Sequence, residues 1–215
     1  MRPAAGAYPL GGVTIMLVQQ LHWARTEERD LEDLAIEQEQ LVGLDLSHLE
    51  YTRIRFHKCR FERCDFSKAA FYQSEFDGCD FSNCSFLDTV WNKCRVSGCK
   101  GDGVKMISSR WKDCSVTDSS FRYGNFSKSL WNRTSLTGCD LREASMAEAR
   151  VSGLEPHGSN FQGVDFFRTP LKGLDLSDCQ IQGITVSESL QELRGLKINP
   201  AQAVDLAPLL GVQLL

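Results

Sequence analysis

Every fifth residue from Leu41 to Val186 is apolar, and the series breaks only at Gly101 and Pro156. A fixed short period of this kind is typical of a chain built from one repeated structural unit. We expect the two breaks to mark local bends or cavities. Aromatic side chains fill half of the series: Tyr51, Phe56, Phe61, Phe66, Phe71, Phe76, Phe81, Phe86, Trp91, Trp111, Phe121, Phe126, Trp131, Phe161 and Phe166.

A second column, two residues before each large residue, accepts small or medium side chains and holds all nine cysteines. Neighbours such as Cys59 and Cys64 lie five residues apart, which differs from the shorter Cys-x-x-Cys spacing of zinc sites. Free cysteine behaves as a small buried hydrophobe. The column therefore predicts limited core space rather than a metal site. An odd cysteine count also fits a reducing compartment, so we expect a cytoplasmic protein.

The two columns predict a chain that coils around a central core. Residues two apart in an extended segment point to the same side, so both columns face inward and the residue between them faces solvent. Only two positions remain before the next unit, so the chain must turn at every repeat, and glycine recurs at the second of them. Trp91, Trp111 and Trp131 lie twenty residues apart, which predicts four units per coil and one stack of indole rings.

Three units carry a resemblance to a known family: Cys-Asp-Phe-Ser-Lys at residues 64–68, Cys-Asp-Phe-Ser-Asn at residues 79–83 and Cys-Asp-Leu-Arg-Glu at residues 139–143. They resemble the repeat of the pentapeptide-repeat family, over about two thirds of the chain. The resemblance implies an all-β fold, a right-handed quadrilateral parallel β-helix, and points to an uncharacterised bacterial branch. A more distant similarity to quinolone-resistance members implies DNA gyrase as an alternative partner, because those members protect gyrase by imitating duplex DNA.

Charge tests that alternative, because B-DNA carries one phosphate per ~1.7 Å of axis. The net charge is −4, yet residues 41–187 hold eighteen acidic and nineteen basic side chains. The negative balance comes from residues 27–39, and a basic segment from Arg53 to Lys68 follows them. The distribution favours a non-enzymatic scaffold for protein–protein interaction with an unknown partner over a DNA-mimicking protector or inhibitor of gyrase. It predicts no direct contact with nucleic acid.

One set of apolar residues stands outside the inward columns. Leu87, Ile107, Ala147 and Phe167 follow large residues at multiples of twenty, with Ser127 in the same series. On a four-sided coil they would align as one exposed ridge, which is a candidate partner surface.

The chain divides into three expected segments: residues 1–30 as an N-terminal extension or cap, 31–187 as the β-helix, and 188–215 as a C-terminal helix that caps the last coil or joins two copies. Within the last segment, Pro200 precedes an amphipathic stretch and Gly211 ends it. Candidate residues for the cap or a homodimer contact are Val204, Ala207, Leu209 and Leu210.

The sequence predicts no enzyme and no catalytic, cofactor-binding or metal-binding residues. The four histidines, His22, His48, His57 and His157, lie in polar turns or terminal segments. No phosphate-binding glycine loop is present in the sequence. The apolar run Val13–Val18 is too short to cross a bilayer, so we expect no membrane association.

Overall fold

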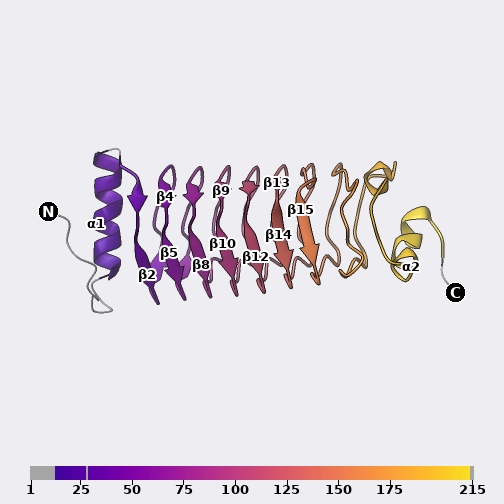
Figure 1. Cartoon of the computed structure of the whole chain (residues 1–215), viewed down its shortest axis with the longest axis horizontal. Helices are drawn as coiled ribbons and strands as arrows, with labels where there is room; N and C mark the ends of the chain where they lie inside the picture. The colour runs from indigo at the N-terminus through magenta and orange to yellow at the C-terminus, as the bar shows by residue number, and fades with distance from the viewer. Residues whose placement is uncertain (1–12, 28, 214–215) are drawn as a thin grey trace.

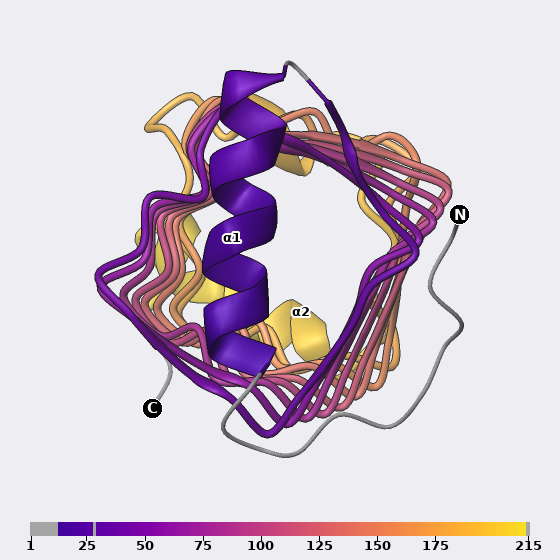
Figure 2. The ribbon, with the colours of Figure 1, turned by 90° about the vertical axis from the view of Figure 1, so that its left-hand side faces the viewer.

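The computed structural model describes residues 13–27 and 29–213, which form a rod (Figure 1). Helix α1 (Val13–Thr26) lies across one end, and α2 (Gln202–Leu206) lies at the other, flanked by the short 3-10 helices η1 (Gln191–Leu193) and η2 (Ala207–Leu210). Between them the chain winds as a parallel β-solenoid. Viewed from the α1 end, it runs clockwise as it recedes, so the coil is right-handed (Figure 2).

Parallel strands stack along the sides of the rod in three sheets. The first sheet contains β1 (Leu31–Glu32), β4 (Glu50–Thr52), β7 (Ala70–Tyr72), β9 (Val90–Asn92), β11 (Arg110–Lys112) and β13 (Leu130–Asn132). The second contains β2 (Ala35–Glu37), β5 (Arg55–His57), β8 (Glu75–Asp77), β10 (Arg95–Ser97), β12 (Ser115–Thr117), β14 (Thr134–Thr137) and β15 (Leu154–His157). The third pairs β3 (Gln40–Val42) with β6 (Arg60–Glu62).

The pairing register confirms four units per coil. Phe71 pairs with Trp91, and Arg95 pairs with Ser115, so stacked residues lie twenty apart. We call the outer surface of the first sheet the β4 side. On a further side, isolated bridges such as Asp45 to Asp65 replace strands, and we call it the bridge side.

The corners share one backbone conformation. The residue two positions after each large residue has a positive φ at nearly every corner from Asp33 to Gly183, whichever side chain it carries. A left-handed non-glycine residue costs about 1–2 kcal/mol, which the hydrogen bonds between stacked coils offset. Gly153 differs from the other glycines of this column, because its φ is not positive. A Cβ there would lie 2.7 Å from the backbone nitrogen of Arg133, so close packing requires glycine.

The large residues fill the centre of the rod. The rings of Trp91 and Trp111 lie 4.6 Å apart at 4°, and those of Trp111 and Trp131 lie 5.1 Å apart at 6°. This arrangement confirms the predicted indole stack. Tyr51 and Phe71 continue the stack toward α1, with ring centroids 4.9 Å apart.

All nine cysteines are free and buried, as the small column predicted. Eight of their thiols donate to backbone carbonyls; for example, Cys59 Sγ donates to Ile36 O at 3.2 Å. Burial raises the pKa of the Cys139 thiol to about 11, so this thiol stays protonated at neutral pH. The column therefore packs the core.

Gly101 marks no cavity, contrary to expectation. A Cβ at this position would lie 2.5 Å from Cε2 of Phe81 and 2.9 Å from Cδ1 of Phe121. The rings from the coils before and after fill the place of the missing side chain, with centroids 6.1 Å apart.

Pro156 marks the end of a sheet. It is buried and pairs with Leu136, so its strand β15 is the edge of the seven-stranded sheet. Proline lacks the N–H that would continue the ladder, whereas Phe161 donates to Gln180 O of the next coil at 2.7 Å. On the β4 side the last bridge joins Leu130 to Arg150, and Pro170, twenty residues after Arg150, lacks the N–H that would bond to the preceding coil.

Pro156→Leu should raise the free energy of unfolding by up to about 1 kcal/mol, because it supplies one N–H to the next coil. Proline also restricts the unfolded chain, so its removal raises the conformational entropy of that state and offsets part of the gain. Urea unfolding of both proteins measures the difference. A clear loss of stability would mean that the fixed φ of proline shapes β15.

Both ends of the coil are covered. Leu17, Leu21 and Ala24 of α1 are buried against the first coil, and Arg25 pairs with Asp45 at 2.9 Å. Residues 1–12 of the expected extension lie outside the described residues. No helix within 13–27 and 29–213 is long and apolar enough to span a membrane.

The coil continues past residue 187, the expected boundary, with two extra residues. Leu171 N donates to Glu192 O, whereas Phe161 N donates to Gln180 O, so the spacing grows from nineteen to twenty-one residues. Asp175 still forms a bridge with Lys197. The sequence pattern missed this last coil because the extra residues break the five-residue period.

Candidate functional site: a ridge, a pocket and a capped end

The predicted ridge residues lie in one column on the bridge side. Asp88 N donates to Ile107 O at 2.9 Å, Lys128 N to Ala147 O at 2.8 Å, and Glu148 N to Phe167 O at 2.8 Å. These bonds place Leu87, Ile107, Ser127, Ala147 and Phe167 on successive coils. Phe167 is 39% exposed, whereas the other members of the column are half-buried. The column is therefore a shallow surface that ends in one exposed ring.

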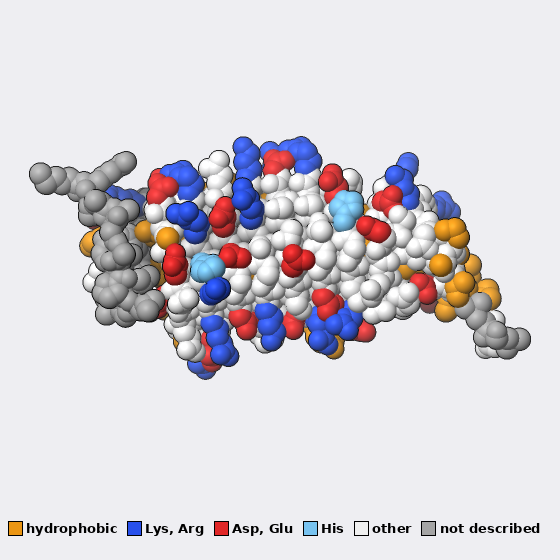
Figure 3. Space-filling view, turned by 60° about the horizontal axis from the view of Figure 1, so that its bottom comes forward, with side chains coloured by type: hydrophobic (Ala, Val, Ile, Leu, Met, Phe, Trp, Pro, Cys, Tyr) orange, Lys and Arg blue, Asp and Glu red, His pale blue; other side chains and the backbone are white. Residues whose placement is uncertain are grey.

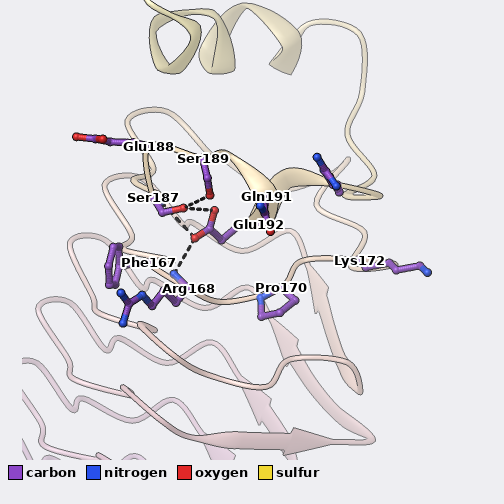
Figure 4. Close-up of a pocket in the computed structure, with 10 residues that line it drawn as sticks. Phe167, Arg168, Pro170, Lys172, Ser187, Glu188, Ser189, Gln191 and Glu192 are labelled. Carbon is purple, nitrogen blue, oxygen red and sulfur yellow. Dashed lines mark hydrogen bonds between the residues drawn. The ribbon is translucent and has the colours of Figure 1, made fainter.

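A pocket of about 820 Å³ opens beside this ring, in the range of small-ligand sites. One wall comes from the coil at Phe167, and the other comes from the segment that carries the two extra residues (Figure 4). The lining residues are Phe167, Arg168, Pro170, Lys172, Ser187, Glu188, Ser189, Gln191, Glu192 and Arg194.

Glu192 holds the pocket together. Its carboxylate accepts hydrogen bonds from Arg168 N at 2.8 Å, Ser187 N at 3.3 Å and Ser187 Oγ at 2.9 Å. Its side chain is buried, and burial alone would raise its pKa, but hydrogen bonds from its own backbone N–H, from Ser187 and from Arg168 hold the pKa below the ordinary value. The carboxylate therefore replaces a backbone carbonyl where the ladder is interrupted.

The pocket carries cations without acidic partners. Within the described ranges, Arg168, Lys172 and Arg194 form no ion pair. The Arg168 guanidinium carbon lies 4.9 Å from the centre of the Phe167 ring, a cation–π contact. The pocket rim thus combines an exposed aromatic ring with positive charge.

The C-terminal segment covers the last coil. Gln202 is buried, and its Nε2 donates to Leu176 O at 2.8 Å and to Cys179 O at 2.7 Å. Among the candidate residues, Leu209 packs against the core and Ala207 is half-buried. Val204 and Leu210 are exposed, and apolar side chains gather at this end of the rod (Figure 3).

The histidines form no metal site. His57 Nδ1 lies 2.7 Å from Asp77 Oδ2, and His157 Nδ1 lies 3.6 Å from Asp178 Oδ2. His22 and His48 are exposed. Among the described residues, no three His, Cys, Asp or Glu side chains are placed to hold one metal ion.

Two family models match the repeats. A pentapeptide repeat region matches residues 54–129, and a model of eight pentapeptide repeats matches residues 119–153. The chain is a pentapeptide-repeat protein. Among curated proteins, no relative matches its sequence.

Solved structures of other pentapeptide-repeat proteins are similar at low identity. A trypsin-treated QnrB1, a plasmid-mediated fluoroquinolone resistance protein, is 19% identical, with a TM-score of 0.47 over 87% of this chain and 100% of that chain. HetL from the cyanobacterium Nostoc, involved in heterocyst differentiation regulation, is 13% identical, with a TM-score of 0.32 over 84% and 93%. At these values neither structure indicates a partner for this chain.

Both signs of charge occur on each side of this pentapeptide-repeat protein. Arg53 bonds to Asp33 Oδ1 at 2.7 Å and to Glu32 Oε2 at 3.0 Å, so the acidic segment partly neutralises the basic first coils. Acidic and basic side chains lie intermingled on the face in Figure 3. Because no described side carries an uninterrupted row of acids, the charge pattern does not favour imitation of duplex DNA.

Sequence reasoning missed Glu192 and Gln202. Both are polar side chains buried where the five-residue period has ended, at 5% and 4% exposure. Glu192 bonds to Arg168 N, and Gln202 bonds to Leu176 O and Cys179 O. These backbone groups of the preceding coil are distant in sequence, so no local pattern identifies them. Only the Asn199–Gln202 spacing, with Gln202 N bonded to Asn199 Oδ1, resembles a helix cap.

Proposed function

We propose that this pentapeptide-repeat protein is a non-enzymatic scaffold that binds another protein through its ridge and pocket. One observation carries the proposal: the exposed Phe167 ring lies where the apolar column meets a pocket whose three cations form no ion pair with any described residue. Aromatic residues, Phe among them, and Arg are enriched at protein interfaces relative to the rest of the surface. The surface suits a protein segment with an apolar anchor beside acidic side chains.

The chemistry of the pocket supports binding rather than catalysis. Ser187 Oγ donates a hydrogen bond to Glu192 Oε2, and Ser189 Oγ lies 2.8 Å from Ser187 Oγ. The lowered pKa of Glu192 makes it a poor base at neutral pH. The residues that line the pocket include no His or Cys. Nine buried free thiols suit a reducing compartment, so the proposal includes a cytoplasmic location.

We assign the C-terminal segment to capping in this proposal. The two hydrogen bonds from Gln202 satisfy carbonyls at the open end of the last coil. Leu206 and Leu209 pack against the core, so this segment has a structural task without any second molecule.

Ile107→Lys combined with Phe167→Lys should leave the fold intact and weaken partner binding at least about tenfold. Tyr123→Lys is the matched control, because Tyr123 is 59% exposed and lies outside the ridge column. Affinity capture with quantitative mass spectrometry identifies proteins lost with the double variant and kept with the control. Titration of the purified partner then measures affinity.

A captured set that is the same for all three proteins would contradict the proposal. Circular dichroism of the double variant provides the folding check. If the fold is lost, the half-buried Ile107 belongs to the core, and Phe167→Lys alone then tests the surface.

A further inference from the structure

The β4 side is polarised along the rod. Near α1 it carries Asp33 and Glu50, which are exposed, and farther along it carries the exposed Arg110 and Arg133. Neither Glu50 nor Arg110 forms an ion pair within the described part of the chain. The other basic residues of this side that form no described ion pair also lie in the later coils: Lys93, Lys112, Arg150 and Lys172.

The middle of the first sheet divides it into two halves of three strands each. Its order is β1-β4-β7-β9-β11-β13, so the middle lies between β7 and β9. A two-fold axis parallel to the strands and above this middle would reverse the rod direction of a second copy. It would place β4 of one copy over β11 of the other, β1 over β13, and β7 over β9.

Wherever this two-fold rotation places two charged residues opposite each other, the two charges have opposite signs. Glu50 comes to face Arg110, since both stand at the first position of their strands. At the corners that follow the strands, the ion pair of Arg53 with Asp33 comes to face the ion pair of Arg133 with Asp113. Asp33 then lies opposite Arg133, and Arg53 lies opposite Asp113. In a two-fold interface each pair occurs twice.

The two middle strands of the side, β7 and β9, carry no charged residue. Ala70 and Tyr72 of β7 and Val90 and Asn92 of β9 are half-buried. The operation brings Ala70 over Val90 and Tyr72 over Asn92. An apolar centre with a charged rim is the usual composition of a protein interface.

We propose that a second copy of this chain docks on the β4 side, with the two rods antiparallel. A long polyanion bound to the basic half would extend into Asp33 and Glu50 at the other half. Two parallel rods would place like charges at the same level. Only the antiparallel pair gives both halves an opposite charge, and electrostatic complementarity of this kind fixes partner and register.

The dimer goes beyond the proposed partner binding and is compatible with it. The ridge and Phe167 lie on the bridge side, which stays open in this arrangement. The two C-terminal segments come to lie at opposite ends, so Val204 and Leu210 of the two copies do not meet.

Sedimentation equilibrium of the full chain tests the proposal. We expect a dimer whose dissociation constant rises at least about tenfold between about 0.05 M and about 0.5 M salt, because salt screens rim charges. Glu50→Arg and Arg110→Glu should each weaken the dimer at least about tenfold, since each opposes like charges twice. The double variant Glu50→Arg with Arg110→Glu should return to within about threefold of the wild type.

Lys105→Glu is the matched control, because Lys105 is exposed on the bridge side and pairs through its backbone with Ser85 and Asn125, which are uncharged. It should leave the dimer unchanged. A monomer at every concentration, or a dimer that survives both single reversals, overturns the proposal. If Leu210→Lys alone dissociates the dimer, the two copies join through their C-terminal segments and the proposal is wrong. Thermal unfolding by circular dichroism confirms that every variant is folded.

Discussion

Trp111→Ala should lower the free energy of unfolding by about 4 kcal/mol, since truncation of a buried Trp costs about 3–5 kcal/mol. The Trp111 side chain is 2% exposed and lies between the parallel rings of Trp91 and Trp131. Its Nε1 donates to Ser109 Oγ at 3.0 Å. The truncation therefore removes two stacking contacts, opens a cavity and leaves the Ser109 hydroxyl without that donor.

Trp111→Phe is the control for ring stacking. Phe71 already stacks on Trp91 with centroids 4.4 Å apart, so a smaller ring fits this column. We expect a loss of about 1–2 kcal/mol, well below that of the alanine variant. Guanidinium unfolding measures both. Because coils contact only their neighbours, a lowered m-value would show that the variant uncouples the two ends of the rod. Equal losses for both variants would show that the stack contributes little.

The five-residue period predicted the fold because each side-chain position repeats the same environment. Trp91, Trp111 and Trp131 needed only their spacing to be placed in one stack, and the pairing register confirms it. The cysteine column was equally predictable, since volume alone decides what fits there. For a solenoid, local pattern and global fold carry the same information.

The site and the N-terminal helix were less predictable for three physical reasons. The extra residues before Lys197 end the period, so the pocket and Glu192 depend on a contact between coils that the pattern does not describe. The exposed fraction of Ile107 depends on its neighbours across the coil. Helix α1 was expected only as an extension or cap, because Val13, Thr14 and Ile15 have low helix propensity and its stability comes from packing.

The polarised β4 side illustrates a different limit. Its charges are visible in the sequence, but a net balance over the whole rod hides them. Reading the outward residues at a period of twenty places Glu50 and Arg110 on one surface, and this period follows only from the number of sides. Net charge is therefore a poor guide to partners for a rod whose sides differ.

Gly101→Leu should lower the free energy of unfolding by about 3 kcal/mol, although the repeat itself calls for a large residue here. The rings of Phe81 and Phe121 already occupy the space, and the first added carbon would lie 2.5 Å from the Phe81 ring. The backbone hydrogen bond from Gly101 N to Ser120 O, at 2.7 Å, ties the position to the next coil and prevents it from moving outward.

A compensating change tests the cause of that loss. Phe81→Leu alone should destabilise by opening a cavity, because Phe81 is fully buried. The double variant with Gly101→Leu should be at least about 1 kcal/mol more stable than the sum of the two single losses predicts. The added leucine fills the cavity that Phe81→Leu opens, and the smaller side chain at position 81 relieves the steric clash. Leu141, three coils after Phe81 on the same side, shows that leucine fits this column at 1% exposure. Urea unfolding of the four proteins gives the coupling energy. A gain in stability from Gly101→Leu alone would mean that the two rings leave a cavity after all.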